Sequence, residues 1–164
     1  MKIIVNDTNI IIDLISISLF EIFLELDYEF HTNDFILNEI SDSNQKVILE
    51  RLIAEDRLIV GETDISDYEH IQALLTKNLS FEDCSIWHYA SKAQGLLLTG
   101  DARLRKEVEK TDVEVRGVLF VFDKLVEESK IAKSEAIEKL TELLNINPRL
   151  PTKEIKKRLD LWSS

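Results

Sequence analysis

Apolar strand-like runs alternate with longer helix-like segments through residues 1–117 of this 164-residue chain. The apolar runs are short and rich in Ile, Val and Leu, which is typical of strands buried on both faces of a parallel sheet. The dipeptides Asn-Gly and Asp-Gly, which commonly close tight hairpins, do not occur. The alternation therefore predicts an α/β fold, a three-layer α/β/α sandwich with a mostly parallel sheet of four to five strands.

The expected strands are 2–6, 29–32, 57–60, 96–99 and 113–116. The clearest helix signal is Ser80 followed three residues later by Asp83, which fits a capping box and predicts a helix through Ala93. Gly95 is expected to end that helix, and Asp34 to cap a short helix after the second strand. Residues 8–14, 18–26, 45–55, 67–77 and 102–110 are also expected to be helical.

Everything after residue 117 has helical spacing, with segments at 118–129, 134–144 and 152–162 and a linker at 145–151. We divide the chain into an α/β domain at 1–128 and a helical C-terminal extension at 129–164. The two parts differ in charge, because residues 130–164 hold eight basic and five acidic side chains whereas the whole chain has a net charge of −11. The tail is expected to balance the acidic body or to cover a partner surface.

Composition excludes several classes of protein. The single cysteine, Cys84, rules out an intramolecular disulfide framework and a Cys-rich zinc site. No apolar run reaches membrane-spanning length, and Lys2 and Asn6 interrupt the N-terminus too early for a signal-peptide core. We therefore expect a cytoplasmic protein without a membrane partner. The net charge of −11 also argues against a general polyanion binder, since phosphate backbones are held by Lys and Arg.

Carboxylates follow the expected strands. Asp7 directly follows the first strand and Asp101 lies just beyond the fourth, so both are expected at the carboxyl edge of the sheet, where ligands of parallel sheets bind. Asp83 and Glu39 stand on helices that could bring them to the same crevice. Oxygen-only ligands of this kind favour Mg²⁺ or Mn²⁺ over zinc. The alternative is structural, because Asp7, Asp34 and Asp101 could each simply cap a helix.

Four motifs in order resemble the PIN-domain ribonucleases, many of which are toxins of toxin–antitoxin modules. They are Val5-Asn6-Asp7-Thr8-Asn9-Ile10, Asn38-Glu39-Ile40, Leu79-Ser80-Phe81-Glu82-Asp83-Cys84-Ser85 and Leu97-Leu98-Thr99-Gly100-Asp101-Ala102-Arg103-Leu104-Arg105. The resemblance covers residues 1 to about 125, and the last motif is similar to PIN proteins that carry an extra helical C-terminal segment. It implies a PIN-like fold.

The resemblance also implies site residues. Asp7, Glu39, Asp83 and Asp101 would form the catalytic, metal-binding quartet, with Glu82 as the alternative register for Asp83. Thr8, Asn9 and Thr99 would be polar groups that orient the carboxylates or bound water. The expected partners are an RNA substrate, an antitoxin protein and a second copy of the chain in a homodimer.

The expected function is metal-dependent hydrolysis of phosphodiester bonds in single-stranded RNA, with water as the nucleophile. Arg103, Arg105 and Lys106 are candidate phosphate contacts; the alternative for them is a solvated helix face paired with neighbouring glutamates. His31, His70 and His88 lack metal-ligand spacing, and structural roles are expected for them.

Two other classes of protein fit the sequence less well, and one non-catalytic alternative remains. The run Asp7-Thr8-Asn9-Ile10 also resembles the Asp-x-Asp motif of haloacid-dehalogenase-like phosphatases, but Asn9 stands where that class needs its general acid. A receiver domain would need an acceptor Asp after the 57–60 strand, where Gly61-Glu62 follows instead. The remaining rival is a non-catalytic PIN-like scaffold that binds a protein or RNA.

Overall fold

A computed structural model describes residues 1–164 and contains one parallel five-stranded sheet, with the strand order β3-β2-β1-β4-β5. The strands are β1 (Ile3–Asn6), β2 (Glu29–Asn33), β3 (Ile59–Gly61), β4 (Leu96–Leu98) and β5 (Val115–Arg116). β1 is central: Val5 is in register with His31 on one side and with Leu97 on the other. The predicted α/β class and strand number are confirmed.

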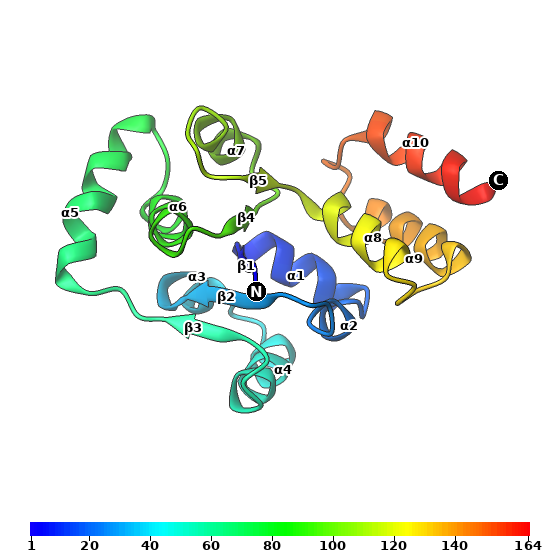
Figure 1. The fold of residues 1–164 in the computed structure, drawn as a ribbon, viewed down its shortest axis with the longest axis horizontal. Coiled ribbons are helices and arrows are strands. Elements are labelled where there is room, and N and C mark those ends of the chain that lie inside the picture. The colour runs from blue at the N-terminus through cyan, green and yellow to red at the C-terminus, as the bar shows by residue number, and fades with distance from the viewer.

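The strand order reverses direction once, so that the switch point lies between the neighbouring strands β1 and β4. Right-handed crossovers therefore place α1, α2 and α4 over one face of the sheet and α5–α7 over the other, while α3 contacts α6. Figure 1 shows α4 and α5–α7 on opposite sides of the strands. The helices before β4 are α1 (Thr8–Ser16), α2 (Phe20–Phe23), α3 (Asp34–Glu39), α4 (Ser43–Ala54), α5 (Ile65–Leu74) and α6 (Phe81–Ala93). A short 3₁₀ turn, Leu75–Lys77, follows α5, and α7 (Ala102–Val108) connects β4 to β5.

The C-terminal extension forms two helices, α9 (Lys133–Ile146) and α10 (Thr152–Ser163), which lie with α8 (Val118–Glu127) at one end of the sandwich (Figure 1). Its apolar side chains belong to the same continuous core as the sheet. Trp162 of α10 is buried and its ring lies 6.4 Å from that of Phe122 in α8. Arg158 of α10 donates to both carboxylate oxygens of Asp123 in α8, at 2.8 and 2.7 Å. No helix in the protein is both long and apolar enough to cross a membrane.

Local details differ from the sequence expectations at three helix ends. Asn33, not Asp34, caps α3 by accepting from the Ile36 amide, while Asp34 instead accepts from the Thr63 hydroxyl. The helix expected at 18–26 is only the single turn Phe20–Phe23. The left-handed residue that ends α6 is Gln94, with φ of 55°, whereas φ of Gly95 is not positive.

Gly95 is required for space, not for its backbone angle. A Cβ atom there would lie 3.0 Å from the Ile3 carbonyl oxygen and 3.2 Å from the Val5 side chain. A side chain at this position would push β1 away from the segment that enters β4.

Candidate active site

The candidate site lies at the carboxyl ends of β1 and β4, where the strand order of the sheet reverses. The crossovers from these two neighbouring strands leave on opposite faces of the sheet, which opens a crevice between them. Asp7 follows β1 and Asp101 follows β4, so the topology brings two residues 94 positions apart to one edge.

Asp7 is buried, at 4% exposure, and its carboxylate is held from two sides. The Thr8 amide donates to Oδ1 at 2.8 Å and the Thr99 hydroxyl donates to Oδ2 at 2.6 Å. Burial raises the pKa of Asp7 to about 6; the two hydrogen bonds oppose that rise, and the negative charges of Asp83 and Glu39 add to it. Asp7 therefore caps α1 and is also a carboxylate that lacks a compensating cation.

Thr99 connects the two strand ends. Its hydroxyl donates to Asp7 and accepts from the Asp101 amide at 3.1 Å. Asp101 in turn caps α7, accepting from the Leu104 amide at 2.8 Å through Oδ1. One carboxylate oxygen of Asp101 has no such bond to the helix and is available to a ligand.

Glu39 at the end of α3 and Asp83 at the start of α6 reach the same region from two helices that contact one another. The Thr8 hydroxyl donates to Glu39 Oε1 at 2.7 Å, so the end of α3 is tied to the start of α1. Burial raises the pKa of Glu39, as do the charges of Glu82 and Asp83, while the Thr8 hydrogen bond lowers it. Burial likewise raises the pKa of Asp83, with Asp101 and Glu82 contributing, although its hydrogen bonds with Ser80 lower it.

The four carboxylates of the sequence-predicted quartet thus repel one another across one crevice, and Glu82 belongs to the same negative region. Their all-oxygen chemistry fits a hard divalent cation. Their spacing is wider than a closed metal cage, because no three ligating side chains lie close enough together to hold an ion. The donor chemistry therefore suits Mg²⁺ or Mn²⁺, whereas the positions of the side chains do not form a closed metal site.

Two predicted supporting residues have defined partners: Thr8 holds Glu39, and Asn9 Oδ1 accepts from the Gly100 amide at 2.9 Å. Asn9 therefore clamps the loop that carries Asp101, and it cannot serve as the general acid of a phosphatase. The sequence analysis missed Asn33, which donates to Ser85 Oγ at 3.1 Å, while that hydroxyl donates to the Glu82 carbonyl at 2.7 Å. The available signal was a polar residue at the carboxyl end of an otherwise apolar strand.

The three candidate phosphate contacts on α7 differ in their surroundings. Arg105 is half-buried and donates to the Thr99 carbonyl at 2.8 Å, in a space that exists because residue 117 is glycine. Arg103 is exposed and donates to the Asn78 carbonyl at 3.4 Å. Lys106 is exposed, and it borders a groove of about 1010 Å³ that runs from Asp101 to the α9–α10 linker.

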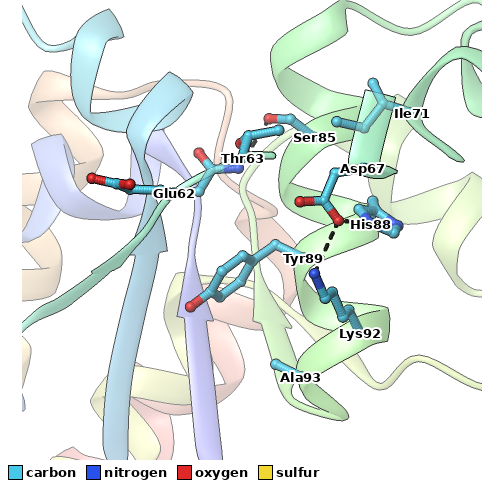
Figure 2. Close-up of a pocket in the computed structure, with 10 residues that line it drawn as sticks. Glu62, Thr63, Asp67, Ile71, Ser85, His88, Tyr89, Lys92 and Ala93 are labelled. Atoms are coloured by element: carbon cyan, nitrogen blue, oxygen red, sulfur yellow. Dashed lines mark hydrogen bonds and ion pairs between the residues drawn. The ribbon is translucent and has the colours of Figure 1, made fainter. Parts of the chain in front are cut away.

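A second pocket, of about 220 Å³, lies between α5 and α6 and is drawn in Figure 2. His88 Nε2 and Lys92 Nζ both approach Oδ1 of the buried Asp67, at 2.8 and 3.1 Å (Figure 2). Burial opposes ionisation of Asp67, yet these contacts and the Asp64 amide outweigh it and hold the pKa of Asp67 below its usual range. His88 therefore has a structural partner and does not join the quartet.

A family model described as a PIN domain (DUF3368) matches residues 3–164, and the chain belongs to this PIN-domain family. The match includes the C-terminal helices as well as the sheet. PIN domains are in general nucleases that use divalent metal ions.

Two solved structures share the fold. VapBC-1 from nontypeable Haemophilus influenzae aligns with a TM-score of 0.53 and 18% identity, covering 71% of this chain and 98% of that one. PAE2754 from Pyrobaculum aerophilum aligns with a TM-score of 0.55 and 15% identity, covering 77% of this chain and 98% of that one. Among curated proteins, no sequence matches the chain. Each alignment leaves more than a fifth of this chain without a counterpart.

Proposed function

We propose that the protein is a metal-dependent endoribonuclease that hydrolyses phosphodiester bonds of single-stranded RNA. The observation that carries this proposal is the link between Asp7 and Asp101 through the Thr99 hydroxyl. Two further carboxylates, Glu39 and Asp83, couple electrostatically to them, in a chain that belongs to a PIN-domain family.

Asp7 and Asp101 would hold Mg²⁺ or Mn²⁺ directly, and Glu39 and Asp83 would complete the site directly or through water. When bound, the metal supplies a Lewis acid that polarises the phosphate and lowers the pKa of an attacking water. The protein orients the carboxylates that receive it: Thr99 and the Thr8 amide fix the Asp7 oxygens, while the Thr8 hydroxyl fixes Glu39. No protein nucleophile is required.

The substrate phosphates would contact Lys106 and Arg103, which lie on the exposed side of α7 next to Asp101. Arg149 and Arg116 line the same groove as Lys106, so the α9–α10 linker adds basic groups to this side of the site. An antitoxin partner is a further part of the proposal, supported by the fold shared with VapBC-1. A homodimer is also proposed, on the family resemblance alone.

The test is cleavage of several labelled single-stranded RNAs with Mn²⁺ or with EDTA, comparing wild type with Asp7→Asn and Asp101→Asn. Cleavage that needs both the metal and Asp7 supports the proposal. A matched control is Asp13→Asn, an acidic residue of α1 that bonds Asn147 outside the quartet. Absence of metal-dependent cleavage from all RNAs would contradict the proposal.

One observation favours a second candidate, a non-catalytic scaffold: the carboxylates are not already gathered into a metal cage. A thermal melt with millimolar Mn²⁺ separates the two candidates. A ligand of the native state raises the melting temperature, so the nuclease proposal expects a rise in wild type and none in Asp7→Asn. If the protein is a non-catalytic scaffold, Mn²⁺ is expected to leave the melting temperatures of both wild type and Asp7→Asn unchanged.

A further inference from the structure

Three aromatic rings from three different helices gather beside the carboxylates. The ring centroids of Phe35 in α3 and Phe81 in α6 are 4.9 Å apart, and those of Tyr68 in α5 and Phe81 are 5.8 Å apart. Phe35 stands nearly perpendicular to Tyr68, at 88°, whereas Tyr68 and Phe81 are inclined by only 31°. We call Phe35, Tyr68 and Phe81 the aromatic platform.

The aromatic platform is largely separate from the hydrophobic core. Phe81 packs against the core, but neither Phe35 nor Tyr68 belongs to it or to the partly buried residues around it. The Tyr68 side chain is 39% exposed, and Phe35 and Phe81 are each partly exposed. Packing against the core therefore accounts for Phe81 but not for Phe35 and Tyr68, whose rings contact Phe81.

The platform shares its helices with the candidate metal ligands. Phe35 lies one helical turn before Glu39 in α3, so the two side chains lie on the same face of that helix. Phe81 lies directly before Glu82 and two residues before Asp83 at the start of α6. α3 and α6 contact one another directly, with the rings of Phe35 and Phe81 4.9 Å apart, so these two helix segments lie against one another.

This placement selects what the platform can bind. The carboxylates around it repel phosphate groups, and the basic residues of the site stand on α7 and the α9–α10 linker instead. A nucleobase is uncharged and stacks on an aromatic side chain whatever its sequence. Stacking can thus supply RNA affinity to a protein whose net charge of −11 opposes backbone contacts.

We propose that the aromatic platform stacks an unpaired base of the RNA strand, next to the phosphate that a metal ion bound by the carboxylates would hold. The inference rests on the proposed ribonuclease function and names a contact that this function leaves open. Because stacking reads the aromatic face and not the base edge, the platform selects single-stranded over paired RNA without strong sequence preference.

The test is equilibrium binding of a short fluorescent single-stranded RNA to Asp7→Asn protein with Mn²⁺, so that the RNA is not cut. Phe35→Leu and Tyr68→Leu keep apolar volume but lose the ring, and each is expected to weaken binding by about 5- to 150-fold. Tyr68→Phe keeps the ring and is expected to bind like its parent. The control Ile65→Ser changes the most exposed apolar side chain of the same helix, at 88% exposure, and is expected to have no effect.

An abasic strand of equal length and charge isolates the contribution of the bases. It is expected to bind more weakly than RNA and to be insensitive to Tyr68→Leu. Unchanged RNA binding by Phe35→Leu and Tyr68→Leu, with native circular dichroism, would overturn the proposal. The proposal would also be overturned if Phe35→Leu or Tyr68→Leu abolished a dimer in sedimentation experiments but left RNA binding intact. The rings would then contact a second copy of the chain and not RNA.

The platform and the nuclease proposal fail separately. Binding that depends on the rings, without cleavage by the wild-type protein, supports the platform and refutes the nuclease. Cleavage by the wild-type protein with a KM that Tyr68→Leu leaves unchanged refutes the platform and supports the nuclease.

Discussion

The Thr99 hydroxyl donates a 2.6 Å hydrogen bond to Oδ2 of Asp7, a residue 92 positions earlier in the chain. The hydroxyl oxygen of Thr99 also accepts a hydrogen bond from the Asp101 amide, and the Thr99 carbonyl accepts one from Arg105. A single small side chain at the end of β4 therefore sets the orientation of two candidate metal ligands.

Replacing Thr99 with Val tests this arrangement. The change keeps the branched shape but removes the donor to a buried carboxylate, which is expected to lower the unfolding free energy by about 1–3 kcal/mol. RNA cleavage is expected to fall by about tenfold or more, since one such bond of about 1.4 kcal/mol corresponds to a tenfold change in rate. Thr99→Ser keeps the hydroxyl and is the control; equal loss in Ser and Val variants would contradict a hydrogen-bonding role.

The raised pKa of Asp7 predicts that Asp7→Asn stabilises the metal-free protein. The pKa of the Asp7 carboxyl is about 6 in the folded protein and 3.8 in the unfolded chain. The folded protein therefore holds this proton more tightly, and its unfolding free energy falls as the pH rises from about 4 to 6. Ionisation of Asp7 is therefore expected to lower the unfolding free energy by about 3 kcal/mol above pH 6 and to have no effect below about pH 4. Asp7→Asn is therefore expected to melt at a higher temperature than wild type at pH 7 in EDTA.

The pH series itself is the control for that prediction. The difference between wild type and Asp7→Asn is expected to shrink as the pH falls from 6 to 4. Under the proposed function Mn²⁺ binds the wild-type carboxylates, so adding it is expected to narrow or reverse the difference in melting temperature at pH 7. A gap independent of pH would mean that the substitution acts through packing and not through ionisation.

Arg105 and Lys106 are neighbours in the sequence with different expected roles. Arg105→Ala removes the donor to the Thr99 carbonyl and is expected to lower the unfolding free energy by about 1–3 kcal/mol in urea titrations. Lys106→Ala is expected to leave stability unchanged, to weaken RNA binding and to reduce its salt slope by about 1. A stable Arg105→Ala protein with reduced salt dependence would instead assign Arg105 to the RNA backbone.

Trp162 tests whether the C-terminal extension folds with the α/β domain. It is buried against Phe122, which belongs to the core continuous with the sheet. Trp162→Ala is expected to cost about 3–5 kcal/mol and to shift one cooperative unfolding transition. The exposed Leu161→Ala, next to it, is the control. Two separate transitions would show that residues 129–164 unfold independently.

The fold was predictable because its signals are local and repeated. Each apolar run and each capping pattern reports on its own segment, and parallel pairing follows from alternation. The sequence predictions were wrong at helix ends where a contact with a residue distant in sequence determines the local structure. Asp34 was expected to cap α3, but Thr63 from the end of β3 engages it and leaves the cap to Asn33. Gly95 was expected to end α6, but Gln94 takes the left-handed position there, and the closeness of Ile3 is what requires a glycine at residue 95.

The site was predictable only in outline. The positions of Asp7 and Asp101 at strand ends follow from the sequence pattern. Glu39 and Asp83 were candidates from their places on nearby helices, and the family resemblance added their role in a quartet. The sequence could not reveal that Arg105 turns inward to Thr99, since that depends on the space left by Gly117. Nor could it place Phe35 beside Phe81, because α3 and α6 are far apart in the sequence and contact one another only in the folded protein.

The pairing of β1 with β4 also governs when the protein can act during its synthesis. Asp7 is made early, yet Thr99 and Asp101 join it only after the chain has passed residue 101 and β4 has docked on β1. Contacts so distant in sequence form late in folding. A ribosome-bound chain would therefore emerge with its acidic residues dispersed, and any nuclease activity would be delayed until most of the polypeptide has been released.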